Sequence, residues 1–337
     1  MAIQKLAMKN VTVFDEITLE FSKGVNVLIG SNGVGKTHVM KLLYSACQAV
    51  REDVSFPHKV VRTFRPDGAA IARLINRNRT PAERNASVRV QSDASGIDMK
   101  FSSSTKKWDA AVTREEQWEK KNAGLESVFI PAKEILSHAC NLTEAVSKGN
   151  VEFDDTYVDV IASAKVDITR TEMPAERSRF LDALRKICGG KVEIDDERFY
   201  LKTGNRKLEF SLVAEGLRKI ALLWQLIQNG ALEKGSILFW DEPEANLNPE
   251  HIPMIADLLL LLQREGVQVF VSTHDYFLAK YLDGRAKEED EIAFFAFYRE
   301  GGGVLCEKKD TFLELEHNPI MDTFMALYRE ELRRGME

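Results

Sequence analysis

The chain has 337 residues, of which 44% are hydrophobic and 29% are charged, and its 46 Lys and Arg against 52 Asp and Glu give a formal net charge of −6. This composition is typical of a globular protein with one large core and an inserted subdomain, or with two lobes. The acidic total argues against a protein that coats nucleic acid with its whole surface, and the apolar run at residues 258–262 is too short to cross a bilayer.

The N-terminal residues and the cysteines both indicate a cytoplasmic protein. Residues 1–5 lack the apolar segment and the small-residue cleavage site of a secretory signal, and no membrane segment is predicted. The four cysteines are isolated, without a C-x-x-C pair, so reduced thiols are expected rather than disulfides or a zinc site. They are Cys47, Cys140, Cys188 and Cys306.

A phosphate-binding loop is predicted near the N-terminus. Three β-rich stretches, at residues 6–13, 17–21 and 25–29, lead into a glycine-rich octet, and residues 36–50 are predicted to form the helix that follows. A strand, this loop and a helix in that order are the structural context of a P-loop, so the chain is predicted to bind a nucleoside triphosphate. The residues expected to surround the nucleotide are Gly30, Ser31, Asn32, Gly33, Val34, Gly35, Lys36, Thr37 and His38.

Two residues of this loop have distinct expected roles. Lys36 is expected to reach the β- and γ-phosphates, while the Thr37 hydroxyl is offered to Mg²⁺. The glycines let backbone N–H groups close around the phosphate oxygens, and the following helix adds the positive end of its dipole.

The segment after the loop is basic and then β-rich. Residues 59–89 are the most basic part of the chain, with eight Lys and Arg against two acids. Alternating apolar and polar residues at 86–92 and 97–102, on either side of an Asp-Ala-Ser-Gly turn, predict a hairpin, which residues 106–108 are expected to extend. The eight cations are Lys59, Arg62, Arg65, Arg73, Arg77, Arg79, Arg84 and Arg89.

The middle of the chain is predicted to be an inserted helical lobe. A short buried strand at residues 127–130 precedes it, and helices are expected at 132–140, 143–147, 157–164 and 175–187. Strand character returns at 191–194, 199–202 and 207–210, before an apolar helix at 216–228. The acids around Asp154, Asp155 and Asp159, and the pair Asp195 and Asp196, are interpreted as helix-start and turn residues rather than metal ligands. The predicted parts are therefore residues 1–131, 132–190 and 191–337.

The C-terminal part supplies acidic residues at strand ends. A strand at 236–240, a helix at 250–265 and a strand at 267–272 predict a parallel sheet. Asp241 and Glu242 end the first strand, where Asp241 is expected to hold Mg²⁺ and Glu242 to orient or deprotonate the attacking water. His274 follows the second strand, at the edge where such sheets bind ligands, and is expected to contact the γ-phosphate. The predicted catalytic residues are Lys36, Glu242 and His274, and the predicted metal ligands are Thr37 and Asp241.

Together, four motifs resemble those of an ABC-type ATPase of the SMC, RecF and overcoming-lysogenization-defect kind, in the subgroup called AAA-family ATPases. They are the P-loop with its Asn32, a signature-like segment at 214–219, the Asp-Glu-Pro-Glu-Ala-Asn-Leu-Asn-Pro segment at 241–249, and Ser-Thr-His-Asp at 272–275. The resemblance implies an α/β fold: an ABC-ATPase head with a parallel P-loop sheet, an N-terminal antiparallel β subdomain and an inserted helical lobe.

The resemblance also implies a homodimer with ATP between the subunits, in which Gly216 presents backbone N–H groups in trans to the partner's γ-phosphate. The family's signature has a serine where this chain has Ala214, so Ser211, or the charges of Arg218 and Lys219, are alternative substitutes. For the glutamine-loop ligand, Lys133 or Glu134 are alternatives to a surface helix start at the same place.

Three functions remain open for such an ATPase. The first is control or scaffolding of a separate effector protein, in anti-phage defence, with the amphipathic residues 319–332 as a partner surface or as a helix packed on its own core. The second is a DNA-binding repair or clamp ATPase, for which residues 59–89 supply phosphate contacts. The third, the energising subunit of a transporter, has no matching coupling feature. Assembly beyond a dimer, and binding of nucleic acid, are left open.

Overall fold

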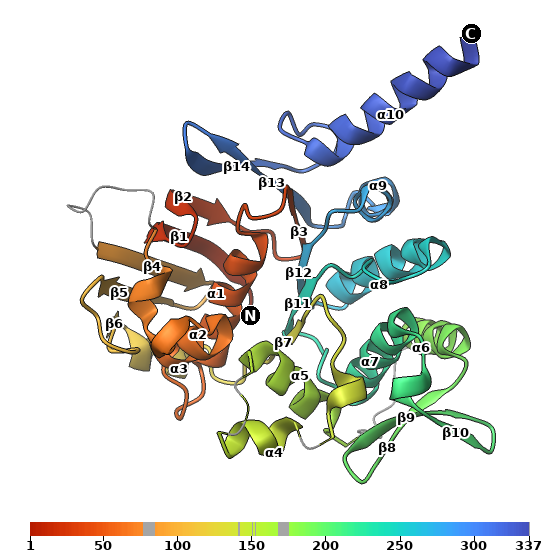
Figure 1. The fold of residues 1–337 in the computed structure, drawn as a ribbon, viewed down its shortest axis with the longest axis horizontal. Coiled ribbons are helices and arrows are strands. Elements are labelled where there is room, and N and C mark those ends of the chain that lie inside the picture. Colours follow the sequence, from red (N-terminus) through yellow and green to blue (C-terminus); the bar gives the residue numbers. More distant parts are fainter. Residues whose placement is uncertain (77–84, 141, 150, 152, 168–174, 337) are drawn as a thin grey trace.

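The protein is built around a mixed six-stranded sheet, seen edge-on in the middle of the computed structural model, which describes all residues except 77–84, 141, 150, 152, 168–174 and 337 (Figure 1). The strand order is β14-β13-β3-β12-β11-β7, with β14 antiparallel to β13 and every other neighbouring pair parallel. The strands are β3 (Val25–Gly30), β7 (Ser127–Ile130), β11 (Ile237–Asp241), β12 (Gln268–Ser272), β13 (Ile292–Glu300) and β14 (Gly303–Lys309).

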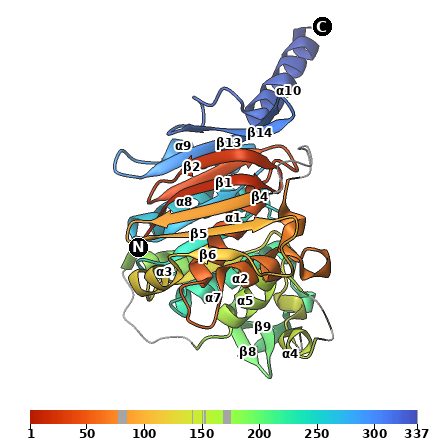
Figure 2. The ribbon, with the colours of Figure 1, turned by 90° about the vertical axis from the view of Figure 1, so that its left-hand side faces the viewer.

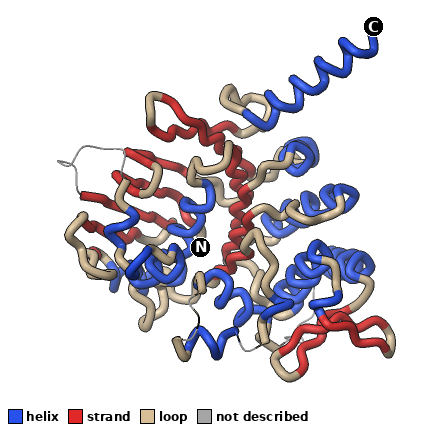
Figure 3. The backbone as a smooth tube through the Cα atoms, viewed as in Figure 1, coloured by secondary structure: helices blue, strands red, loops and turns tan. Residues whose placement is uncertain are grey.

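A second, antiparallel sheet lies opposite one face of the central sheet, with helix α1 (Lys36–Gln48) between them (Figures 1 and 3). Its order is β2-β1-β4-β5-β6. Strand β2 alternates buried and exposed residues because its outer face meets water, whereas β3, β11 and β12 are buried along their whole length because both of their faces are covered. The antiparallel strands are β1 (Ile3–Val11), β2 (Phe14–Glu20), β4 (Asn85–Ser92), β5 (Gly96–Ser102) and β6 (Ala111–Thr113).

Helices cover the other face of the central sheet (Figure 1). α7 (Glu215–Gln228), α8 (Ile252–Arg264) and α9 (Tyr276–Arg285) pack their apolar sides into one continuous core with β3, β11 and β12. Beside them lie three further helices and the small antiparallel sheet β10-β9-β8. These elements are α4 (Leu142–Ser147), α5 (Asp155–Ala164), α6 (Ala175–Cys188), β8 (Lys191–Asp195), β9 (Arg198–Thr203) and β10 (Arg206–Glu209).

Two predicted elements are wrong. Residues 132–140 contain only the short 3-10 turn Leu136–His138, because the Glu134 carboxylate accepts hydrogen bonds from the Ser137 backbone and hydroxyl, which competes with a regular helix. Residues 106–108 form no strand, since Lys107 has a left-handed backbone with φ 47° that ends an extended chain, and β6 lies further on.

Most of the described cations in the basic stretch at residues 59–89 pair with acids, although the side chains of Arg62, Arg73 and Arg89 stay about half exposed. The ion pairs are Lys59 with Asp155 at 2.8 Å and Asp159 at 2.6 Å, Arg62 with Asp155 at 3.0 Å, Arg73 with Asp67 at 3.4 Å, and Arg89 with Asp98. Arg77, Arg79 and Arg84 lie outside the described residues. The acids of α5 therefore do more than begin a helix. Asp154 does cap α5, but Asp155 and Asp159 neutralise the positive charges of Lys59 and Arg62 in α2 (Phe56–Phe64).

Replacing Lys59 with methionine should destabilise the protein. Lys59 and Asp155 are both buried, and removing the cation leaves a carboxylate in the interior whose remaining cationic partner among the described residues is the half-exposed Arg62. We expect the free energy of unfolding to fall by about 3 kcal/mol, as for other broken buried ion pairs. Urea denaturation measures this change. As the control, Arg73→Met, which removes an exposed ion pair, should lower the free energy of unfolding by less than about 1 kcal/mol. Equal effects of the two changes would contradict a structural role for the Lys59 pair.

The C-terminal helix α10 (Pro319–Met336) projects away from the rest of the molecule (Figures 1 and 2). At its base Phe324 stacks on Tyr276 of α9, with ring centroids 4.1 Å apart. Beyond that contact Leu327 is 54% exposed, Tyr328 49% and Leu332 44%. Of the two alternatives for the amphipathic residues 319–332, packing along the chain's own core is therefore wrong for most of the helix. In the described part of the chain, no helix has the length and apolar character that crossing a membrane would require.

Candidate functional site

The P-loop connects β3 to α1 and is shaped by its neighbours. At Gly30, with φ 139°, an added Cβ would lie 2.3 Å from the carbonyl oxygen of Phe297 in β13. At Gly35, with φ 93°, it would lie 2.7 Å from the ring of Phe14. Only glycine fits either position, and the loop between them exposes Ser31 and Asn32.

The Lys36 side chain lies over this loop and next to His274, which follows the neighbouring strand β12. Its ammonium donates to the carbonyl oxygens of Gly30 at 2.7 Å and Ser31 at 3.2 Å, and lies 3.0 Å from Nε2 of His274. The side chain is largely buried, and this desolvation lowers the pKa of Lys36 to about 8, although Asp241 and Glu242 favour its charged form. The cation is thus held where a bound phosphate would neutralise it.

Because of this lowered pKa, ATP binding should depend on pH. Above pH 8 most of the free protein has a neutral Lys36, and phosphate binding must return the proton, so the ATP dissociation constant should rise about tenfold between pH 7 and pH 9. Titration calorimetry at pH 8 in buffers of different ionisation enthalpy should show uptake of about half a proton per ATP. Lys36→Arg, whose guanidinium does not titrate there, should lose the proton uptake. A dissociation constant that does not change with pH would contradict the shifted pKa.

Asp241 and Thr37 meet at the carboxyl edge of the parallel strands. Since β3, β12 and β11 are adjacent and parallel, their C-terminal ends bring the P-loop, Ser272 and Asp241 together. The Thr37 hydroxyl donates to Oδ2 of Asp241 at 3.0 Å, and the Ser272 hydroxyl also donates to this carboxylate. A hydroxyl and a carboxylate suit Mg²⁺, a hard cation that takes its remaining ligands from phosphate and water. Accordingly, no group of three or more His, Cys, Asp or Glu among the described residues forms an all-protein metal site.

Glu242 and His274 face each other next to Lys36. Glu242 has a left-handed backbone, with φ 48°, and its Oε1 lies 3.5 Å from Nε2 of His274. Non-glycine residues in this conformation cost about 1–3 kcal/mol and cluster at functional sites. Burial, together with the Lys36 charge, lowers the pKa of His274, so the imidazole is neutral at physiological pH.

Glu244 has a role that the sequence does not indicate, although it lies within the 241–249 segment. Its buried carboxylate accepts from the Thr273 hydroxyl at 2.7 Å and from the backbone N–H of His274 at 3.0 Å, and burial raises the pKa of Glu244. It therefore holds the histidine turn of β12 against the end of β11. Another missed residue, Arg299 of β13, donates to the Gly33 carbonyl oxygen at 2.9 Å. No local signal marks Arg299, because it is 266 positions from the loop that it contacts.

The side chain of His38 faces α2. Its ring lies 5.4 Å from the ring of Phe64, and burial lowers the pKa of His38 to about 4. Its Nδ1 is buried and has no hydrogen-bond partner among the described residues. A contact between His38 and the nucleotide stays a prediction.

The signature-like segment begins α7 and its charges are directed inward. Gly216 is buried, and a Cβ there would lie 2.3 Å from the carbonyl oxygen of Asn246. Arg218 forms an ion pair with buried Glu134 at 2.6 Å and donates to two backbone carbonyls, while Lys219 is 1% exposed. These cations are therefore not available to replace the missing serine hydroxyl of the signature. The same pair makes Glu134 an internal anchor of α7 rather than part of a surface helix start.

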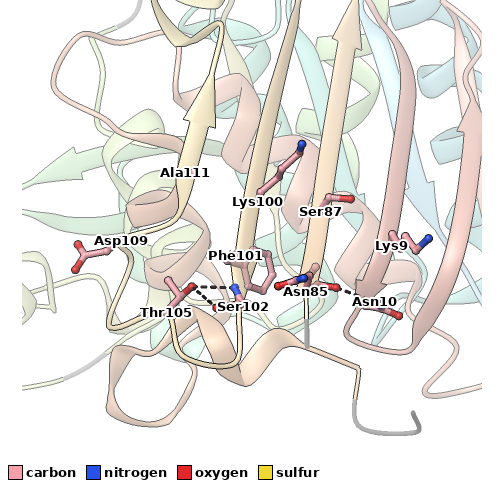
Figure 4. Close-up of a pocket in the computed structure, with 11 residues that line it drawn as sticks. Lys9, Asn10, Asn85, Ser87, Lys100, Phe101, Ser102, Thr105, Asp109 and Ala111 are labelled. Atoms are coloured by element: carbon pink, nitrogen blue, oxygen red, sulfur yellow. Dashed lines mark hydrogen bonds between the residues drawn. The ribbon is translucent and has the colours of Figure 1, made fainter. Parts of the chain in front are cut away.

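A separate cavity of about 650 Å³ lies on the outer side of the antiparallel sheet (Figure 4). Lys9, Ser87 and Lys100 come from adjacent positions on β1, β4 and β5, while Phe101 lies near the end of β5 and Thr105 lies in the loop that follows it. None of the residues that line it belongs to the P-loop or to the acidic strand ends. The nucleotide site is therefore not this cavity.

Most of the chain matches one known protein family. Residues 25–280, well over half of the chain, match the family described as "AAA domain, putative AbiEii toxin, Type IV TA system". The chain belongs to this AAA-domain family. As a member, it is a P-loop ATPase-family protein, and such proteins bind ATP.

Curated relatives of this AAA-domain protein share only a short segment with it. The DNA replication and repair protein RecF of Bacillus cytotoxicus is 32% identical over 78 residues, which are 23% of this chain and 21% of RecF. RecF of Ligilactobacillus salivarius is 35% identical over 71 residues, 21% of this chain and 18% of that protein. The chain thus spans about a fifth of the length of these relatives.

Solved structures show that the fold of this AAA-domain protein is that of an SMC head. An SMC head bound to the C-terminal winged-helix domain of ScpA superposes with a TM-score of 0.61 at 14% identity, covering 93% of this chain and 99% of that one. The SMC head domain with a coiled coil and joint from Pyrococcus yayanosii gives 0.58 at 12% identity, covering 97% and 99%. The SMC head domain from Thermotoga maritima gives 0.51 at 16%, covering 92% and 100%. The predicted α/β head with its antiparallel β subdomain is confirmed.

Proposed function

We propose that this protein hydrolyses ATP with Mg²⁺ at the P-loop. The observation that carries the proposal is the convergence of Lys36, Asp241, Glu242 and His274 at one sheet edge, within hydrogen-bond or ion-pair distance of one another or of Thr37. Lys36 would neutralise the β- and γ-phosphates, and Thr37 with Asp241 would hold Mg²⁺, whose charge would polarise them. Glu242 orients the attacking water and accepts its proton, and neutral His274 donates to the γ-phosphate.

We further propose that ATP joins two copies of the chain. The start of α7, with the N–H groups around Gly216, is the surface of one protomer that faces the γ-phosphate on the other, because a helix N-terminus favours an anion. ATP binding would close this homodimer and hydrolysis would open it, and the dimer can serve as the unit of a larger assembly.

We propose that the reaction controls or scaffolds a separate effector protein in defence against phage. The family description, which names a type IV toxin–antitoxin system, supports this setting. The exposed apolar side chains of α10 are the proposed surface for the effector, since they project from the ATPase body (Figure 1). In this proposal the protein acts in the cytoplasm and is organised as residues 1–131, 132–190 and 191–337.

The alternative is an ATPase that binds DNA, as the similarity to RecF suggests. The basic stretch supports it less than the sequence alone indicates, because its cations at positions 59, 62, 73 and 89 pair with acids. Cations held by neighbouring carboxylates have less charge to offer a phosphate backbone.

Affinity purification from the native host separates the two functions. The Glu242→Gln variant, held with ATP, is compared with Lys36→Ala, and all retained protein and nucleic acid is identified by mass spectrometry and nuclease treatment. The effector proposal predicts a protein that is retained in stoichiometric amount by Glu242→Gln and not by Lys36→Ala. This protein should be lost when Leu327 and Tyr328 are changed to serine. Nuclease-sensitive nucleic acid alone would overturn the effector proposal in favour of the DNA-binding alternative.

A further inference from the structure

Lys219 is a buried cation that binds backbone carbonyls instead of a carboxylate. It lies in the first turns of α7 and is 1% exposed, and its ammonium donates to the carbonyl oxygens of Ala245 at 2.9 Å and Glu242 at 3.4 Å. Burial lowers the pKa of Lys219, while acids of the site, Glu215 foremost, favour its charged form. Because burying an ammonium is costly, its presence here needs a reason other than stability.

The segment that Lys219 contacts is a strained turn. Glu242 and Asn246 both have left-handed backbones, with φ 48° and 61°. This conformation costs Glu242 about 1–3 kcal/mol, whereas asparagine tolerates it at a lower cost. Within the turn, the Ala245 N–H donates to the Glu242 carbonyl at 3.1 Å and the Leu247 N–H to the Glu244 carbonyl at 3.0 Å. Two hydrogen bonds of this kind contribute about as much free energy as the strain costs, so contacts from outside the turn are needed to hold it in one conformation.

Strand β12 supplies one such contact, because the Glu242 N–H donates to the Ser272 carbonyl oxygen at 3.0 Å. Helix α7 supplies contacts at two further points, one helical turn apart. Lys219 binds the beginning and the middle of the strained turn, and Gly216 packs directly under its end, where the Asn246 carbonyl oxygen occupies the place of a side chain. Positions three apart lie on the same face of a helix. One face of α7 therefore fits the whole turn from residue 242 to residue 246.

We propose that Lys219 is a positioning residue for hydrolysis, which fixes the backbone of Glu242 so that its carboxylate stays at the reacting water. The inference rests on the proposed ATP hydrolysis and adds to it a physical link within one protomer between the signature-like segment and the water-activating acid. Since α7 also bears Gly216, a shift of this helix when the partner's nucleotide binds would be passed to Glu242 through the Lys219 ammonium.

The test compares Lys219→Met, which keeps the length and apolar stem but loses the donors, with the wild-type chain. ATP affinity should stay within about threefold while kcat falls at least about tenfold, because the loss affects the acid and not the phosphate site. In a Glu242→Gln background, Lys219→Met should lower kcat further by less than about twofold, since a residue that acts through Glu242 has nothing left to position. Lys59→Met, which also removes a buried cation but contacts no residue of the turn, should keep kcat within about threefold of the wild type.

A second measurement does not depend on activity. After correction for the change in the free energy of unfolding of each variant, hydrogen exchange of the Ala245 and Leu247 amides without nucleotide should be at least about tenfold faster in Lys219→Met than in the wild type, and unchanged in Lys59→Met. Unchanged exchange, an unchanged kcat, or additive losses with Glu242→Gln would each overturn the role of Lys219. If the wild-type chain fails to hydrolyse ATP, the proposed function is wrong, and the exchange measurement still decides whether Lys219 holds the turn.

Discussion

Lys36→Ala should abolish ATP binding, with affinity reduced by more than about a hundredfold, because it removes the only P-loop side chain placed to neutralise the phosphates. The Lys36 ammonium already lies within the loop, where it donates to the carbonyl oxygens of Gly30 and Ser31. Equilibrium dialysis with radiolabelled ATP measures the loss, and steady-state phosphate release should disappear with it.

The matched control for this change is Lys9→Ala, because Lys9 is an exposed lysine on the outer side of the antiparallel sheet. The affinity of the Lys9→Ala variant for ATP should stay within about twofold of the wild type. Turnover in Lys36→Ala equal to that of the wild type would show that the octet is not the site of the nucleotide.

Glu242→Gln should bind ATP as the wild type does but turn it over at least about a hundredfold more slowly, which is the usual contribution of a positioned general base. The amide keeps the size of the side chain, and Thr37 and Asp241 still hold the metal, so only proton acceptance from the water is lost. Single-turnover kinetics with a separate measurement of ATP affinity distinguish the chemical step from binding.

Glu250→Gln provides the comparison, since Glu250 is an exposed acid directly after the 241–249 segment, and its carboxylate contacts Asn248 and His251. It should leave kcat within about twofold. If Glu242→Gln instead lost ATP affinity, Glu242 would be a ligand that holds the site together rather than the base.

The sequence by itself determined the nucleotide loop and the acidic strand end. A phosphate loop depends on glycines and a lysine at fixed spacing between a strand and a helix, and all of these requirements lie within about fifteen consecutive residues. The buried strands could also be predicted from the sequence, because strands covered on both faces are continuously apolar. Asp241 and His274 could be placed at one edge because parallel neighbouring strands end at the same side of a sheet.

Only the tertiary structure decided what the charged residues do. Lys59 is indistinguishable in sequence from a solvent-exposed cation, yet it is buried against Asp155, about a hundred residues away. Arg218 and Lys219 looked available for phosphate and are turned toward Glu134 and the 242–246 turn, while Arg299 reaches the P-loop from β13. The physical reason is that local patterns record backbone geometry and burial periodicity. The partner of a long charged side chain depends instead on which distant segments the fold brings within a few ångströms.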